Sequence, residues 1–355
     1  MTTKADLKKL YCKSKKRKIL AIFFVFIALI ITALLSMSLG AASPGILEAL
    51  NVISSRIFPF LNLNPGSSLD QMIIWNIRLP RIIMGVLAGA GLAAAGVTMQ
   101  GVLRNPLVSS YVLGISSAAG FGAALAIVLG VSIVSFGGYL VIGNAFIFCL
   151  IAMIMVYMIA RIRGMSSETV ILAGVAVGFL FSALLSLLQY FSKSTQAVNA
   201  VVFWLMGGLY TATWDNILIC TPLVVIAIIL MFSQAWNINI MSMGEEVATS
   251  LGVNSKRVLT VNMILETVAT ASIIAFTGVI GFVDLISPHI ARMLIGNDHR
   301  YLIPCSIVIG SFTLVAADTL ARLVISPVEL PVGIVTSLLG VPFFIYLLAS
   351  KRRSF

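Results

Sequence analysis

Three acidic side chains, Glu266, Asp284 and Asp318, lie inside or beside long apolar runs of the sequence. A charge at the centre of a membrane helix costs about 2.5 to 3.5 kcal/mol on insertion scales, so each carboxylate needs a basic partner, water or a proton. Asp318 and Arg322 are four positions apart and can form an ion pair within one helix. The sequence identifies no partner for Glu266 or Asp284. A proton-coupled secondary transporter would use such carboxylates directly, and this alternative stays open.

The residues of common catalytic and metal sites are missing from the sequence. His289 and His299 are the only histidines, and the four cysteines stand singly, three of them in apolar runs where a thiol behaves as a small hydrophobe. No lysine follows a glycine, so the chain lacks the step with which a Walker A loop holds ATP phosphates. Neither Gly-x-Ser-x-Gly nor His-Glu-x-x-His occurs. We therefore expect no enzyme activity, no metal and no cofactor held by this chain.

A polar segment from about residue 237 to 258 carries the signals of a short helix. Ser242 can cap a helix with acidic residues in its first turn, and Gly252 can end it. Val247 and Leu251 would then share one face, spaced to fill a groove on a partner protein. The segment is either such a docking helix or a solvated loop.

The composition indicates an integral membrane protein. The 355 residues are 60% hydrophobic and 10% charged, with a mean hydropathy of +1.09, so polar groups are too few to cover a soluble globule. About 20 apolar residues in a helix cross a hydrocarbon core about 30 Å thick. We predict an all-α polytopic fold with ten spans at about residues 19–39, 79–100, 109–130, 138–160, 168–191, 215–235, 258–276, 278–296, 301–324 and 331–350.

Basic residues are distributed unequally around these spans. If the spans alternate from an inside N-terminus, 18 of the 23 Lys and Arg residues fall inside, which places both termini in the cytoplasm. The net charge of +11 then indicates flanks that face anionic lipid rather than nucleic acid, since no basic face is interleaved with aromatic residues. We expect a cytoplasmic tail at 1–18, one transmembrane domain at 19–350 and a second tail at 351–355. Signal-peptide cleavage near residues 40–43 is the alternative for the first span.

The stretch from Arg78 to Gly122 is rich in small residues. Gly85 and Gly89 stand four apart among alanines, which lets neighbouring helix backbones approach closely in lipid. Asn105-Pro106 then breaks the apolar run. We expect tight helix packing around residues 79–100.

Several fragments occur in the order typical of one permease family. They are Arg78-Leu-Pro-Arg81, Gln100, Asn105-Pro106-Leu107, Leu113-Gly114, Trp204-Leu-Met-Gly-Gly-Leu209, Gly281-Phe-Val283, Pro288-His289 with Arg292, and Glu329-Leu-Pro-Val-Gly-Ile334. With them the chain resembles the FecCD-type permeases, the membrane subunits of ABC importers for ferric siderophores, haem and cobalamin, over about residues 78–346. Two places depart from the family pattern. Val108-Ser109-Ser110 replaces Ala, a polar residue and Pro, and Asp284 stands where Gly is usual.

The resemblance implies a fold and a set of partners. The fold would be that of the vitamin-B12 importer, a type II ABC importer permease with an inverted repeat. Two copies of a separate ATPase subunit would bind ATP and Mg inside, a substrate-binding protein would deliver the cargo outside, and a second permease copy would complete a homodimer or a heterodimer. The cargo would be a ferric siderophore, or else cobalamin or haem. The protein would lie in the cell membrane of a prokaryote.

The resemblance also implies roles for particular residues. ATPase coupling would use the motif Glu246-x-Ala248-x-x-x-Gly252 and its neighbours, namely Gly244, Glu245, Glu246, Ala248, Leu251 and Gly252. Binding-protein docking would use Arg78, Arg81 and Arg322, whose alternative is contact with lipid phosphate. A cytoplasmic gate would use Asn105, Pro106, Leu107, Ser166 and Ser167, and the alternative is a plain turn with a serine helix cap. Gln189, Thr336 and Ser337 would line the pathway, or else hydrogen-bond to neighbouring helices.

Overall fold

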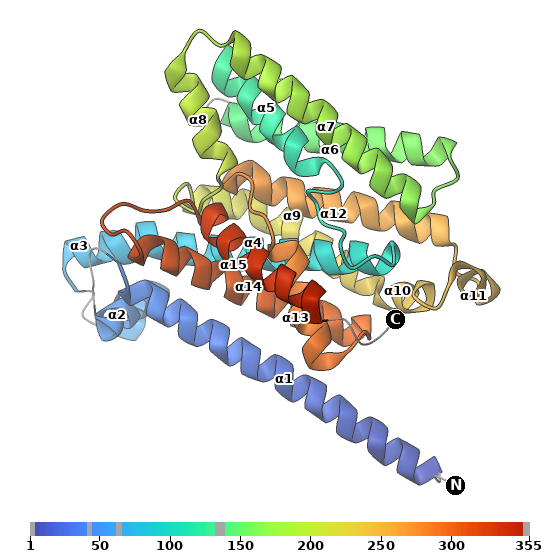
Figure 1. Ribbon diagram of the computed structural model, residues 1–355. Coiled ribbons are helices and arrows are strands. Elements are labelled where there is room, and N and C mark those ends of the chain that lie inside the picture. The colour runs from blue at the N-terminus through green and yellow to red at the C-terminus, as the bar shows by residue number, and fades with distance from the viewer. Residues whose placement is uncertain (1–3, 41–44, 62–65, 132–138, 351–355) are drawn as a thin grey trace.

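The computed structural model describes residues 4–40, 45–61, 66–131 and 139–350, and these ranges contain helices and turns but no strand (Figure 1). The expected tail at 351–355 lies outside the described residues, as do residues 41–43 of the possible cleavage site. Most of the expected N-terminal tail, in contrast, lies within the described residues. It belongs to the same helix as the first span, since α1 covers Lys4–Ser38.

Each of the ten expected spans coincides with a helix. They are α1, α4 (Leu79–Val102), α5 (Ile115–Leu129), α6 (Leu140–Ile162), α7 (Ser167–Phe191), α9 (Trp214–Ser233), α12 (Ser255–Thr277), α13 (Val283–Ile295), α14 (His299–Leu323) and α15 (Val332–Ser350). In the described ranges, seven helices are long and apolar enough to cross a membrane, whereas α5, α13 and the apolar part of α15 are shorter. Each of these three helices follows a non-helical segment, at 103–114, 278–282 and 324–331.

The remaining helices are short. They are α2 (Ile46–Ile57), α3 (Ser68–Gln71), α8 (Thr195–Leu205), α10 (Ala235–Met241) and α11 (Glu245–Ser250). α2 is the kind of surface helix that the proline-rich segment between the first two spans allows, while α8 was not among the expected elements. A long helix followed by a non-helical segment and a shorter helix occurs in α4–α5, in α12–α13 and in α14–α15. The inverted symmetry of the two halves stays a prediction.

The second span begins earlier than expected. A π-helical stretch, Met72–Arg78, leads directly into α4, so one helical rod runs over Ser68–Val102. Pro80 has no N–H to donate to the preceding turn, and it stands where the π-helical stretch passes into α4. Arg78 and Arg81 therefore lie within a continuous helix and not at its loop entrance.

Helix α4 is the buried axis of the bundle and packs against α9, α12, α13 and α14. A side-chain carbon at Gly89 would lie 2.3 Å from the carbonyl oxygen of Gly310, and one at Gly96 would lie 1.9 Å from that of Asp284. Only glycine fits at such contacts, so α4 and its neighbours meet backbone to backbone. The tight packing expected from the small residues is confirmed.

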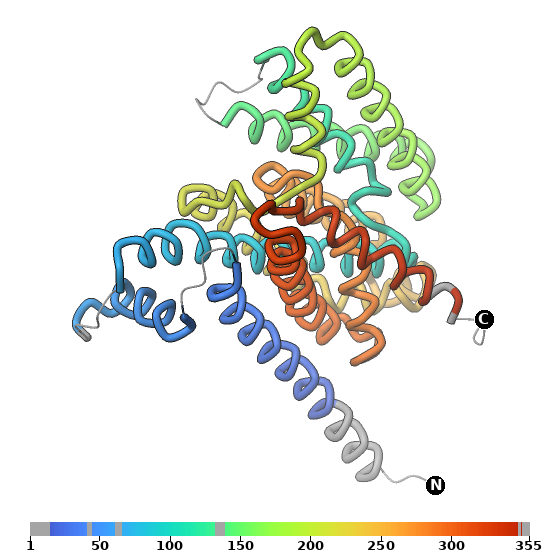
Figure 2. The backbone as a smooth tube through the Cα atoms, turned by 60° about the vertical axis from the view of Figure 1, so that its left-hand side comes forward, coloured from blue at the N-terminus to red at the C-terminus, as the bar shows by residue number. Residues whose placement is uncertain are grey.

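The bundle has two distinct ends (Figure 1). One, here called the α2 end, carries α2, α3 and the last turn of α1, and the other, the α11 end, carries α10 and α11. Helix α15 finishes toward the α11 end, and α1 has its last turn at the α2 end (Figure 1 and Figure 2). Helices α5 to α8 form a group beside this axis, with α5 and α6 against α12.

Candidate functional site

A cavity of about 650 Å³ lies where non-helical segments of the chain approach one another. Its walls come from the segments 109–112 and 279–282, the last turn of α8, the first turns of α5 and α13 and the first two turns of α15. Irregular backbone at membrane depth is tolerated where it lines a cavity, because its polar groups then find partners there. The polar side chains of its wall are Ser109, Ser110, Ser116, Asp284 and Ser337.

Asp284 is held at this cavity by Ser110. Its Oδ2 atom accepts hydrogen bonds from the backbone N–H of Ser110 at 2.8 Å and from its hydroxyl at 2.7 Å. Asp284 also stands in the first turn of α13, where the helix dipole favours a negative charge. The two departures from the family pattern, at 110 and 284, are thus in direct contact. A proline at 110 could not donate the backbone hydrogen bond.

Gln100 connects this cavity with a second one. Its amide nitrogen donates to the carbonyl oxygens of Val108, at 3.3 Å, and of Asp284, at 3.2 Å. Its Oε1 atom accepts a hydrogen bond of 2.6 Å from Arg292. Gln100, Arg292 and Arg104 line a cavity of about 490 Å³ toward the α11 end. Gln100 therefore braces the wall that separates the two cavities.

The two segments expected to form a gate line different cavities, and Arg104, the residue before Asn105, shares one of them with Ser166 and Ser167. Asn105 folds back on itself, since its Oδ1 atom accepts from the backbone N–H of Leu107 at 2.9 Å, and Pro106 lines the second cavity. Ser166 caps α7 by accepting from the N–H of Thr169. Ser166 and Ser167 line a small cavity of about 150 Å³, and its other wall includes Arg104 and Lys256. The turn and the serine cap are both observed, and the gate role stays a prediction.

The three residues expected to line the pathway, Gln189, Thr336 and Ser337, do not share one cavity. Ser337 lines the 650 Å³ cavity. Thr336 is buried and donates to the carbonyl oxygen of Gly333 in its own helix, at 3.1 Å. Both lie in the second turn of α15 and not at its centre. Gln189 lies in the last turn of α7 and is not part of the wall of the 650 Å³ or the 490 Å³ cavity.

The short helix in the 237–258 segment is present as α11. It begins after Gly244, whose φ of 119° only glycine adopts readily, and ends before Gly252 at φ 80°. Ser242 does not cap it, which corrects that expectation. Its hydroxyl donates to the carbonyl oxygen of Asn239 at the end of α10, because the break at Gly244 separates the two helices.

The two faces of α11 differ as the pattern predicted. Ala248 is fully buried, and α11 packs against α10 and α12. Val247 and Leu251 are apolar side chains that are 39% and 59% exposed. Glu245 and Glu246 are exposed in the first turn, where their charges suit the helix dipole. The helix thus presents apolar and acidic side chains outward at one end of the bundle.

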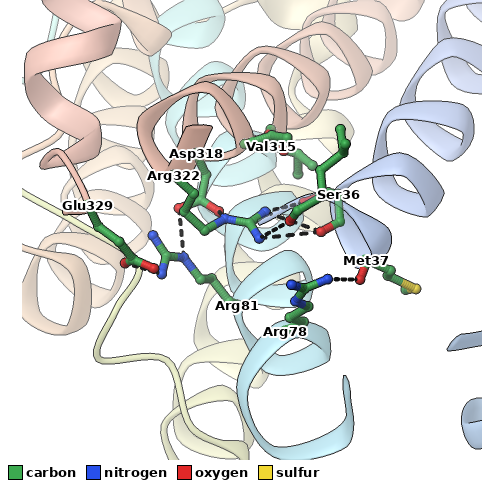
Figure 3. A network of polar contacts seen from close by, with 10 residues as sticks. Ser36, Met37, Arg78, Arg81, Val315, Asp318, Arg322 and Glu329 are labelled. Carbon is green, nitrogen blue, oxygen red and sulfur yellow. Dashed lines mark hydrogen bonds and ion pairs between the residues drawn. The ribbon is translucent and has the colours of Figure 1, made fainter. Parts of the chain in front are cut away.

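At the α2 end, Arg81 lies in an internal ion-pair network (Figure 3). Its Nε atom is 2.8 Å from Oδ1 of Asp318, and its Nη1 atom is 2.7 Å from Oε2 of Glu329. Asp318 also accepts from Nε of Arg322 at 3.2 Å, so the pair expected within α14 is confirmed. The side chains of Arg81, Asp318 and Arg322 are at most 7% exposed, whereas that of Glu329 is 48% exposed.

Arg322 and Arg78 hold the end of α1. Arg322 donates to Oγ of Ser36 at 2.5 Å and to the carbonyl oxygen of Leu39 at 3.1 Å. Arg78 donates to the carbonyl oxygen of Met37 (Figure 3). The last carbonyls of a helix have no partner within it, and cations are favourable there. The three arginines expected to dock a binding protein are therefore buried, and two of them cap a helix of their own chain. Their docking role stays a prediction.

Two partners in these networks were not identified from the sequence. Glu329 opens the motif 329–334, but its contact with Arg81 spans 248 positions, so no local spacing signals it. Ser110 and Asp284 both depart from the family pattern, and this joint departure is the signal in the sequence that corresponds to their contact.

Glu266 finds local partners only. It is buried in α12, and the hydroxyls of Thr267 and Thr270 lie 3.3 and 3.5 Å from its carboxylate oxygens. Among the described residues no basic side chain pairs with it or with Asp284.

The protein is a bundle of apolar helices, and a cavity lies where several of these helices are interrupted. The short helix α11 exposes apolar and acidic side chains at one end of the bundle, and an ion-pair network is buried at the other. These features are those of a membrane transport subunit. The sequence model of the FecCD transport family matches residues 28–350, and the chain belongs to this family. Its members are membrane permeases of ABC importers and not enzymes, in agreement with the missing catalytic motifs. The recognition made from the ordered fragments is confirmed.

Known relatives and one solved structure support this assignment. The chain is 36% identical to the Fe(3+)-citrate import system permease protein of Bacillus subtilis, over 96% of this chain and 98% of the relative. It is 37% identical to the hemin transport system permease protein of Yersinia pestis, over 93% and 95%. It is 41% identical to the cobalamin import system permease protein of Halobacterium salinarum, over 79% and 74%. An inward-facing metal-chelate type ABC transporter matches the fold with a TM-score of 0.81 and 32% identity, over 93% of this chain and 98% of the other.

Proposed function

We propose that this chain is the membrane-spanning subunit of an ATP-driven importer of a metal chelate, and that the chelate is an iron-siderophore complex. Cobalamin and haem are the other members of the cargo class. The observation that carries the proposal is α11, because its exposed Val247 and Leu251 and its acidic first turn have no partner surface within the described part of this chain. A groove on an ATPase subunit would bury them.

The proposed assembly has two permease copies, two ATPase subunits that bind ATP and Mg, and one extracytoplasmic binding protein. A homodimer is proposed over a heterodimer. The α11 end faces the cytoplasm, since the basic residues near that end outnumber those near the α2 end. Both termini then lie in the cytoplasm of a prokaryotic cell. Alternating access would connect the 650 Å³ cavity to one side and the 490 Å³ cavity to the other, with Gln100 between them.

The test is uptake into proteoliposomes that contain the permease, its ATPase and external binding protein. A panel of ferric hydroxamate, ferric citrate, haem and cobalamin serves as the cargo. We expect uptake of one member to require internal ATP and to continue when an ionophore collapses the proton gradient. Uptake that follows the gradient and ignores ATP would overturn the proposal in favour of a proton-coupled carrier.

A further inference from the structure

The wall of the 650 Å³ cavity carries charge of one sign. Asp284 is the single acidic residue among the described residues that line this cavity, and no lysine, arginine or histidine is among them. Four serines supply hydroxyls to the same wall, namely Ser109, Ser110, Ser116 and Ser337. A molecule in the cavity therefore meets one carboxylate and several groups that can donate or accept hydrogen bonds.

Three helices begin at this cavity, and Asp284 belongs to one of them. The first turns of α5, α13 and α15 contribute to the wall. The N-terminus of a helix favours a negative charge, because its first N–H groups have no partner within the helix. Asp284 stands in the first turn of α13, and its Oδ2 atom also accepts the two hydrogen bonds from Ser110. A side chain of the protein itself thus fills the position that an anion would take at the start of α13.

The hydrogen bonds of Asp284 do not explain why a carboxylate stands there. The side chain is 3% exposed, and within the described part of the chain it has no basic partner. A buried carboxylate without such a partner is costly, whereas a neutral amide oxygen could accept the same two bonds from Ser110. What the carboxylate adds over an amide is a negative charge in the wall of the cavity.

We infer that Asp284 determines the charge selectivity of this cavity, so that chelates with an anionic group are excluded and uncharged or cationic chelates are favoured. The inference rests on the proposed function, in which the cargo passes through the 650 Å³ cavity. An anionic group there would meet a like charge with no cation beside it, at a place where the protein excludes water and screening is weak. Within the proposed class of cargo, an uncharged complex of iron(III) with three hydroxamates is therefore favoured over the anionic citrate complex.

The test measures uptake of three ferric trihydroxamates that share one scaffold and differ in a single pendant group, which is a hydroxyl, an ammonium or a carboxylate. Proteoliposomes with the ATPase and one external binding protein contain either the wild-type permease or Asp284→Asn. Since the binding protein is the same in both, its own preference cancels when the uptake ratios of the two permeases are compared. We expect the ratio of anionic to uncharged uptake to rise about tenfold in Asp284→Asn, and the ratio of cationic to uncharged uptake to fall.

Glu266→Gln is the matched control. It removes another buried carboxylate, but Glu266 lies in α12 and does not line the 650 Å³ cavity, so both ratios should stay unchanged. Asp284→Glu keeps the charge and should retain the wild-type ratios, whatever its rate of uptake. If Asp284→Asn does not fold, Asp284→Ser provides the same comparison, because a serine removes the charge and leaves a hydroxyl that can accept from Ser110.

Unchanged ratios in Asp284→Asn would overturn the inference, and the proposed function would stand if uptake of the uncharged chelate still required ATP. An equal change of the ratios in Glu266→Gln would also overturn the inference, since the effect would then not come from the cavity wall. A wild-type complex that takes up none of the three chelates, nor any other metal chelate, with ATP would overturn the proposed function, and the inference with it.

Discussion

The Nε atom of Arg81 lies 2.8 Å from Oδ1 of Asp318, although the two residues are 237 positions apart in the sequence. This contact joins α4 to α14, and Arg322 shares the same carboxylate from the next turn of α14. One buried carboxylate thus lies between two buried guanidinium groups. Its removal would leave two cations facing each other in a site with little access to water.

Asp318→Asn should therefore destabilise the protein strongly. Breaking a buried pair by removing one partner costs about 3 to 5 kcal/mol, because the remaining charge has no compensation. We expect a large fall in the midpoint of thermal unfolding in detergent and a low yield of folded protein. Glu329→Gln is the control, since its carboxylate is half exposed and such pairs contribute about 1 kcal/mol or less. Similar losses for both variants would contradict this account of the network.

Gly89→Ala should weaken the contact between α4 and α14. The added carbon would meet the carbonyl oxygen of Gly310 at 2.3 Å, and a main-chain atom cannot move aside as a side chain can. Overpacking of this kind costs about 1 to 3 kcal/mol. Gly281→Ala is the matched control, because an added carbon there meets nothing within 4 Å and its φ is negative. The measurement is the midpoint of thermal unfolding of both variants. Equal midpoints would contradict the close backbone contact between α4 and α14.

Leu251→Asp should prevent assembly with the ATPase while the permease still folds. Leu251 is 59% exposed, so the free subunit tolerates a charge, but a groove that buries this side chain would not. Co-purification of the ATPase measures the effect. Ser250→Asp places the same charge on the neighbouring exposed residue and should retain more of the partner. Full recovery of the ATPase with Leu251→Asp would remove α11 from the interface.

Glu266→Gln should leave uptake dependent on ATP and independent of the proton gradient. The partners of Glu266 are two hydroxyls of its own helix, which an amide oxygen can also accept from, so a loss of about 1 kcal/mol in stability is expected. Uptake by Asp284→Asn should likewise depend on ATP and not on the proton gradient. The rate of uptake can change, because Asp284 lies on the wall of the 650 Å³ cavity. Vesicle uptake with and without an ionophore is the measurement. Loss of coupling in either variant would favour the proton-coupled carrier.

The sequence by itself determined the helical membrane fold and the family. Apolar runs of about 20 residues can satisfy their backbone in lipid only as helices, so ten such runs predicted ten helices, and each is present. The glycines at 85 to 96 predicted close helix contacts because small side chains let the backbones of neighbouring helices approach each other in lipid. The local signal at Gly252 likewise marked the end of α11, since only glycine readily takes its φ angle, whereas the start predicted from a Ser242 cap was wrong.

Only the tertiary structure decided which polar groups meet. Asp318 with Arg322 was predictable because one helical turn joins them, but Arg81 with Glu329 and Ser110 with Asp284 depend on how distant segments cross α4 and α13. The burial of the three arginines could not be predicted from the sequence either. Arg78, Arg81 and Arg322 have the appearance of exposed docking residues in the sequence, and the folded chain instead covers them with the end of α1 and with Glu329. Their partners are carbonyl and carboxylate oxygens brought close by packing, and sequence spacing carries no record of such contacts.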